Sequence, residues 1–312
     1  MIATFLVLNP TFWPYLAAVA LLAAGSAAIV QGRVSPAAGV EKSWRLGPLF
    51  LAVPMGVFGA DHFVASKSIA QIVPAWMPWH LFWVYFVGTA LIAAALSIVS
   101  HRHSALAATL LGGMLLSFVF LIHIPTVIEQ PDRFAVAILF RDLSFSAGAF
   151  ALAMERAHRL SPGRARSLAS LLRYALAVPT LIFGVEHYLH PGFAPVIPLK
   201  QPLPSWIPAQ APLAYITGSV LLVASACLLI DWRSRQVATW LGAFVFAIVM
   251  LVYLPLLVAN PFDIVPVNYF FDTLAFAGSA LLLADLLRKT EEARADATAH
   301  AGMSGAQAGL GY

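Results

Sequence analysis

Charge is scarce in this sequence. Of its 312 residues only 10% are Asp, Glu, Lys or Arg, whereas 61% are apolar. A soluble domain is about 25% charged and about 45–50% apolar, so the composition excludes an ordinary soluble enzyme. Long stretches carry no charge at all, among them 16–30, 91–99, 220–230 and 243–257. Because a helix of roughly 20 apolar residues crosses a bilayer core about 30 Å thick, the sequence predicts an integral membrane protein.

Cysteine is almost absent as well. The one cysteine, Cys227, lies in an apolar run, which excludes a disulfide framework, a C-x-x-C pair and a thiolate zinc site. Lys and Arg outnumber Asp and Glu by 18 to 14. In a membrane protein that excess reports topology before it reports a ligand. We therefore expect the lipid bilayer as the main partner and no nucleic acid.

Apolar windows and the breaks between them predict nine transmembrane helices. The expected fold class is all-α, a polytopic membrane helical bundle. Pro10 and Pro14 flank the start of the first helix, so whether that helix crosses the membrane fully stays open. The nine predicted helices cover residues 12–31, 47–64, 80–99, 105–124, 135–155, 170–189, 212–230, 236–257 and 267–287.

The basic residues predict an orientation. Fourteen of the 18 fall between helices on one side of the predicted bundle, and only Lys67, Arg133 and Lys200 fall on the other, with Arg141 inside a helix. Basic loops stay in the cytoplasm, so we expect a cell-membrane protein with its N-terminus outside and its C-terminus in the cytoplasm. Most prolines fall in the loops predicted to be outside, which indicates rigid outer loops.

An internal repeat is the most informative pattern. Phe58-Gly59-Ala60-Asp61-His62 returns 125 residues later as Phe183-Gly184-Val185-Glu186-His187, and Pro74-Ala75-Trp76-Met77-Pro78 returns 130 residues later as Pro204-Ser205-Trp206-Ile207-Pro208. The larger offset reflects a five-residue insertion between the two motifs. Each unit holds four predicted crossings, an even number, so the two units should run parallel. Further matching pairs at the larger offset are Tyr85 and Tyr215, Gly88 and Gly218, Pro125 and Pro255, Asp142 and Asp272, and Gly148 and Gly278.

The repeat predicts the organisation of the chain. The expected segments are 1–46, an N-terminal helix and cytoplasmic loop; 47–155, the first four-helix unit; 156–169, a basic cytoplasmic linker; 170–289, the second unit; and 290–312, a tail expected to be disordered in the cytoplasm. Small residues such as Gly88, Gly112, Gly113 and Gly148 are expected at close helix contacts inside each unit.

The repeated motifs resemble a known family. F-G-x-[DE]-H at a helix end, P-x-W-[MI]-P leading into the next helix and an Asp in the fourth helix are similar to the DoxX-like membrane proteins, a four-helix family. The resemblance implies two fused copies over residues 47–287. It also implies an association with respiratory and sulfur-redox membrane subunits, including a quinone-reducing thiosulfate oxidoreductase, although the family supplies no agreed catalytic residues.

Charged residues inside a helix that crosses a membrane each need a reason, since they are costly there. Asp142 and Asp272 are candidate proton acceptors or cation ligands, and Arg141 is a candidate to hold an anionic or carbonyl group. In the alternative, the two Asp residues bond helix termini or loops, and Arg141 extends toward the outer headgroups. The sequence leaves both interpretations open.

A second set of candidates lies at corresponding helix ends. Asp61-His62 and Glu186-His187 are adjacent titratable pairs, which suit proton transfer. A metal bound by His62, His80, His123 and Asp142, and a haem held by His62 and His187, are alternatives that no diagnostic spacing supports. The first unit is the better candidate for an active site, because its His80, His123 and Arg141 become Gln210, Tyr253 and Phe271 in the second.

Aromatic residues gather on the predicted outer side. Trp76, Tyr85 and Trp206 are typical of an interfacial aromatic belt, with a pocket for a lipophilic ring as the alternative.

Three functions follow. The first is a membrane redox component with a quinone or similar lipophilic ligand, in which Asp61, His62, Arg141 and Asp142 manage protons and a partner subunit supplies electrons. The second is a small proton-coupled transporter, and the third is a non-catalytic assembly subunit. The sequence defines neither the substrate nor the oligomeric state.

Overall fold

The structure is a computed structural model that describes residues 9, 11–30, 40–157, 161–199 and 203–309. Within these ranges every regular element is a helix. Eight of the helices are long and apolar enough to cross a membrane. The fold class is therefore all-α, as predicted, and the architecture fits a helical membrane protein.

The helices follow the predicted order closely, and two of them, α3 and α5, have the predicted bounds. The elements are α2 (Phe12–Val30), η1 (Val40–Leu46), α3 (Gly47–Val64), α4 (Ser66–Ile69), α5 (His80–Val99), α6 (Ser104–Phe118), η2 (Val119–His123), α7 (Ile124–Glu129), α8 (Arg133–Arg156), α9 (Pro162–Leu189), α10 (Gln210–Leu229), α11 (Ser234–Ile248), η3 (Val249–Tyr253), α12 (Leu254–Ala259) and α13 (Ile264–Gly309).

Eight of the nine predicted spans are among these helices. The ninth is α2, a helix of 19 residues close to the predicted bounds, and its crossing of the membrane stays a prediction. This helix packs along α3, where a Cβ on Gly56 would meet the side chain of Leu21 at 2.2 Å. Helix α2 is therefore packed against the bundle, in contact with α3 and α5.

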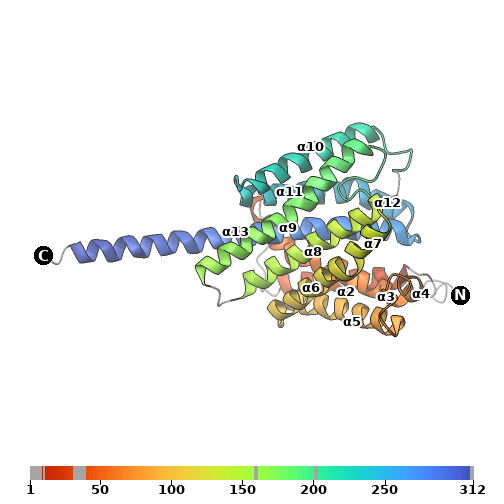
Figure 1. Ribbon diagram of the computed structural model, residues 1–312, viewed down its shortest axis with the longest axis horizontal. Coiled ribbons are helices and arrows are strands. Elements are labelled where there is room, and N and C mark those ends of the chain that lie inside the picture. The colour runs from red at the N-terminus through yellow and green to blue at the C-terminus, as the bar shows by residue number, and fades with distance from the viewer. Residues whose placement is uncertain (1–8, 10, 31–39, 158–160, 200–202, 310–312) are drawn as a thin grey trace.

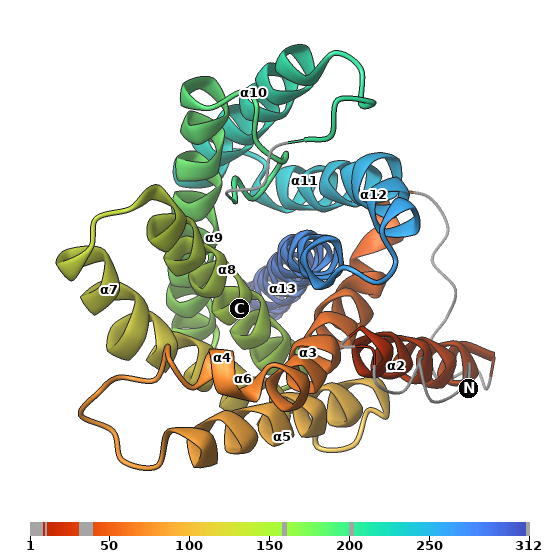
Figure 2. The same cartoon turned by 90° about the vertical axis from the view of Figure 1, so that its right-hand side faces the viewer.

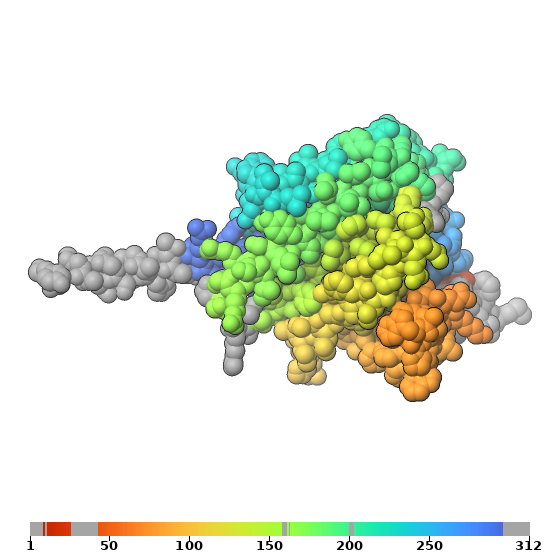
Figure 3. Space-filling view, viewed as in Figure 1, coloured from red at the N-terminus to blue at the C-terminus, as the bar shows by residue number. Residues whose placement is uncertain are grey.

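Helix α13 forms the centre of the bundle. Its segment Ile264–Ala295 is the most deeply buried of the eight spans. Figure 2 shows it enclosed by α3, α8, α9 and α11. In the space-filling view of Figure 3, its blue surface shows only towards the two ends of the bundle. A helix that is apolar all round is expected at such a buried position.

We call α3 to α8 the first half of the bundle and α9 to α13 the second half. The first and last long helices of the two halves are interlocked. α3 packs mainly against α5 and α13, and α9 packs mainly against α10 and α8. The two last helices, α8 and α13, also pack against each other. Each half therefore contributes helices to the core of the other, and the halves are not separate bundles.

Unusual backbone geometry recurs at an interval of 130 residues. Left-handed φ angles occur at Trp79 and Ala209, at His101 and Asp231, and at His103 and Arg233. The π-helical turns also fall 130 residues apart, at Val119–His123 and Val249–Tyr253. Non-glycine residues with such φ values are uncommon, so six of them in three equally spaced pairs indicate shared local geometry.

Two expected segments differ in the structure. The tail expected to be disordered after Thr290 is instead a continuation of α13 to Gly309, because it is rich in Ala, which favours helix. The expected linker 156–169 is mostly helical, since α9 already begins at Pro162, a favourable first position. Of the shorter connection that remains, residues 158–160 lie outside the described residues.

Glycines mark the closest approach between the halves. A Cβ on Gly148 of α8 would lie 2.7 Å from Cα of Ser279 on α13. Gly88 instead faces His62 on α3, and Gly112 faces Phe150 on α8, contacts within one half as expected. The expectation is wrong for Gly148, whose contact lies between the halves, and for Gly113, which has nothing within 4 Å.

Replacing Gly148 by Leu should destabilise the bundle strongly. The clash is with a backbone atom that cannot rotate away, and overpacking of this kind costs about 1–3 kcal/mol or more. The same replacement at Gly113 is the matched control, because the added side chain meets only open space. Thermal unfolding in detergent should show a clear decrease for Gly148→Leu and little change for Gly113→Leu. Equal shifts for the two variants would contradict this packing.

Candidate functional site

The two ends of the bundle differ in composition, and we name them accordingly. The proline-rich end carries the connections 65–79, 130–132, 190–209 and 260–263. The basic end carries the connections 100–103, 157–161 and 230–233. Figure 2 looks onto the proline-rich end. The predicted site residues lie in the half of the bundle near this end.

A buried charge cluster lies where α8 meets α13. Arg141 donates through Nε to Asp142 Oδ1 at 2.9 Å and through Nη1 to Asp272 Oδ1 at 3.1 Å and Oδ2 at 3.2 Å. His123, in the π-helical turn η2, donates through Nε2 to the other oxygen of Asp142 at 2.8 Å. The structure thus joins four of the predicted candidates in one hydrogen-bonded network.

Little of this cluster reaches the surface. Asp142 and Asp272 are 4% and 2% exposed, and the side chain of Arg141 is 22% exposed. Arg141 lies eight residues into α8, about 12 Å along the helix at roughly 1.5 Å per residue. At such a depth charged groups must pair with one another.

The observed contacts decide between some of the alternatives that the sequence left open for Arg141, Asp142 and Asp272. Arg141 turns inward to two carboxylates, so the expected extension toward the headgroups is not seen. Asp142 and Asp272 bond Arg141 and His123, and not the helix termini or loops that the structural alternative invoked. The cluster links α8 of one half to α13 of the other.

Asp61 adds a further carboxylate to this region. It is 7% exposed, and its Oδ1 atom is buried without a hydrogen-bond partner among the described residues. It also lies close enough to Asp272 for the two carboxylates to repel. This region therefore holds three buried carboxylates and one guanidinium group, that of Arg141, with His123 bonded to Asp142.

His62 and His187 share one arrangement but differ in their surroundings. In each ring Nδ1 donates to the carbonyl oxygen four residues earlier at 2.6 Å, that of Phe58 and Phe183 respectively. The backbone N–H of Val196 donates to His187 Nε2 at 2.9 Å. Nε2 of His62 has no such partner in the described part of the chain.

Glu186, the counterpart of Asp61, has a partner that the sequence analysis did not connect with it. Arg133 at the start of α8 donates to Glu186 Oε2 at 3.0 Å, donates to the carbonyl of Pro198 at 3.0 Å and lies over the ring of Phe193. The sequence contained one clue to this contact: apart from Arg141, Arg133 is one of only three basic residues that the sequence places on this side of the bundle. The contact shows that Glu186 is held in an ion pair.

The connection between α9 and α10 folds into the bundle. Its residues 194–199, which we call the inserted segment, are all buried, and Val196 has a left-handed φ of 75°. The hydroxyl of Tyr253 donates to the carbonyl of Pro195. Part of the longer connection of the second half therefore fills interior space.

The remaining candidates lie apart from the cluster. Trp76 and Trp206 are 69% and 54% exposed. Tyr85 stacks on Phe63 at 5.6 Å between ring centroids and donates to Ser66 Oγ. His80 is the first residue of α5 and is half-buried. Trp79, which precedes it, has a left-handed φ angle. These positions fit an aromatic belt and do not line the charge cluster.

The metal and haem alternatives find little support in the geometry. Over the described ranges, no three His, Cys, Asp or Glu side chains form a group that would hold a metal ion. His187 already uses both ring nitrogens, one as donor to Phe183 and one as acceptor from Val196. A symmetric haem ligated by His62 and His187 therefore does not fit.

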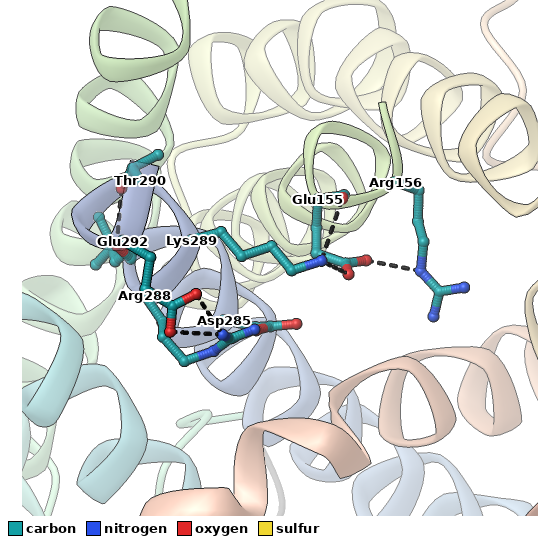
Figure 4. A network of polar contacts seen from close by, with 8 residues as sticks. Glu155, Arg156, Asp285, Arg288, Lys289, Thr290 and Glu292 are labelled. Atoms are coloured by element: carbon teal, nitrogen blue, oxygen red, sulfur yellow. Dashed lines mark hydrogen bonds and ion pairs between the residues drawn. The ribbon is translucent and has the colours of Figure 1, made fainter. Parts of the chain in front are cut away.

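A second network ties α8 to α13 at the basic end (Figure 4). Lys289 of α13 donates to Glu155 of α8, which also accepts from Arg156 at 2.7 Å. Arg288 of α13 joins Asp285 at 2.5 Å and Glu292 at 2.8 Å. These contacts lie at the basic end, whereas Arg141 lies towards the proline-rich end, so the two helices are fixed at two levels.

Replacing Arg141 by Met should destabilise the protein by about 3–5 kcal/mol, because it leaves two buried carboxylates without their partner. The triple variant Arg141→Met/Asp142→Asn/Asp272→Asn removes those charges too and should recover most of the loss. Arg235→Met, which breaks the exposed pair with Glu291, should cost less than about 1 kcal/mol. Thermal unfolding in detergent measures all three. If the triple variant is no more stable than Arg141→Met, the cluster is not a charge-balanced unit.

Comparison with known proteins identifies no relative: no family model, no curated protein and no solved structure matches this chain.

Proposed function

We propose that this chain is a membrane redox component that binds a quinone-type ligand near the proline-rich end and supplies protons for its reduction. Reduction of a quinone to a hydroquinone takes up two electrons and two protons. A partner subunit would supply the electrons, since Asp61, His62 and the Arg141 cluster carry protons only. The resemblance to DoxX-like proteins motivates the choice of quinone and is part of the proposal.

One observation supports the proton-carrying role above the others. Asp61 is buried, has an unpartnered carboxylate oxygen and lies beside Asp272. The only guanidinium group of the cluster, Arg141, is already shared between Asp142 and Asp272. An unpaired carboxylate in an apolar interior is stable only when it binds a proton or a cation, so Asp61 is a proton store next to a charged network.

The duplication is also part of the proposal. We infer two parallel four-helix units that share an ancestor, α3 to α8 and α9 to α13. Support comes from the paired left-handed residues, the paired π-helical turns and the reciprocal packing of α3 with α13 and of α9 with α8. The basic residues favour placing the basic end and the C-terminus in the cytoplasm, with the N-terminus outside the cell membrane.

A proton-coupled transporter is the second candidate, favoured by a different observation. The ion pair between Arg141 and Asp272 joins the two halves across a helix contact. Transporters built from repeats move one half against the other around such a site. Protonation of Asp272 would weaken this pair and loosen the contact.

Quantifying quinone in protein extracted with its native lipid tests the first candidate. Mass spectrometry should find about one quinone per wild-type chain and at least fivefold less in Asp61→Leu, which has lost the proton store. Glu129→Leu, at an exposed carboxylate of the same end, is the control and should keep the ligand. Absence of quinone from the wild type, or equal amounts in wild type and Asp61→Leu, would contradict the proposal.

Proteoliposomes loaded with a pH-sensitive dye separate the two candidates. External amino acids, sugars or organic acids should leave the internal pH unchanged if the protein is a redox component. A pH change driven by one of these solutes, and lost in Arg141→Met/Asp272→Asn, would favour the transporter instead.

A further inference from the structure

The two halves differ at one corresponding interior region, which we call the corner: the space beside His187 and Tyr253 in the second half and beside their counterparts His62 and His123 in the first. In the second half the inserted segment 194–199 occupies the space beside His187 and Tyr253. The corresponding connection of the first half, 65–79, has no buried residue. Figure 2 shows this connection swinging outward after α4, whereas the one after α9 turns in toward α11.

Helix contacts fit this difference. Among the described elements, α4 touches only α3 and α5, and α7 touches only η2 and α8. Helix α4, the one helix of the connection 65–79, therefore does not contact the helices that would form the opposite wall of this corner.

Side chains around the corner are correspondingly more accessible in the first half. His187 and Tyr253 are 2% and 1% exposed. Their counterparts His62 and His123 are half-buried, and so is Phe118, whose counterpart Ile248 is buried. The first half thus presents a partly open version of a site that the second half fills with its own chain.

The hydrogen bonds of His62 define what would fill the open corner. Its Nδ1 carries the proton, because that nitrogen donates to the carbonyl of Phe58. In a neutral ring the other nitrogen, Nε2, is then an acceptor. His187 shows the same tautomer with the position filled, since the N–H of Val196 donates to its Nε2.

We propose that the first half holds a ligand site at His62 Nε2, occupied by an apolar molecule that offers an O–H or N–H donor where the second half offers Val196 N–H. For the quinone-type ligand of the proposed function, on which this inference rests, the form bound is the hydroquinone. A quinone has only acceptor oxygens and cannot donate to Nε2, whereas a hydroquinone hydroxyl can.

The approach to this site suits an apolar ring. Phe63, Tyr85 and Phe82 are 45%, 42% and 54% exposed on the adjoining surface of α3 and α5. In a bilayer this surface faces lipid, so a membrane-soluble aromatic molecule reaches His62 without crossing water.

Binding of duroquinol to the full-length protein in lipid nanodiscs tests the proposal. Duroquinone and duroquinol dimethyl ether are the matched probes, because each keeps the ring and lacks the donor. Nitrogen NMR of the histidine rings should show duroquinol shifting His62 Nε2, with the other two probes binding at least fivefold more weakly. His62→Phe should weaken duroquinol binding about fivefold, as loss of one hydrogen bond implies, whereas His190→Phe should not.

Modification with diethylpyrocarbonate provides a second, chemical readout at the His62 ring itself. His62 should react, duroquinol should slow the reaction at least threefold, and His187, covered by Val196, should stay protected. An unreactive His62, or equal binding of duroquinol and its dimethyl ether, would overturn the proposal.

Failure of this site and failure of the proposed function are distinguishable. Duroquinol binding at His62 without any co-purified native quinone would refute the redox role and leave the donor site standing. Native quinone that depends on Asp61, together with duroquinol that binds equally well to the wild type and to His62→Phe, would refute the donor site and leave the redox role standing.

Discussion

The pairing of Arg141 with Asp142 and Asp272 is the contact on which the arrangement of the helices depends. Three charges lie in a bundle whose helices are otherwise almost wholly apolar, so they are tolerated only when they meet. Two of them come from α8 and one from α13, which fixes the register of these helices towards the proline-rich end. Glu155 and Lys289 join the same helices at the basic end.

Helix α13 is central because each of its faces finds a partner. Gly278 lets the backbone of α3 approach, and Ser279 fits against Gly148 of α8. With little hydrophobic drive between helices in lipid, such close contacts and polar pairs supply the specificity. The interlocked packing of α3 with α13 and of α9 with α8 then follows, and neither half has a complete core alone.

The two halves differ in whether corresponding polar side chains have hydrogen-bond partners. The second half uses Arg133, Tyr253 and its inserted segment to satisfy Glu186 and His187. In the first half Asp61 Oδ1 is buried without a partner, and His62 Nε2 has none among the described residues. Polar atoms left unpaired in an interior are costly. Asp61 is the one carboxylate with such an atom in the described part of the chain, which favours the first half as the place of a ligand.

Apolar runs and their breaks determined the helices, to the residue in the case of His80–Val99, and the composition determined the membrane class. The apolar pattern gave no signal for the tail, which continues α13 as a helix to Gly309, because local propensity and not an apolar face decides its conformation. The candidates Arg141, Asp142, Asp272 and His123 were all visible in the sequence as costly charges or titratable groups. Only the tertiary structure decided that they bond one another, that Arg133 belongs to Glu186 and that residues 194–199 fill one half and not the other, because these contacts join residues up to 131 positions apart, and periodicity along a helix carries no information about its partners.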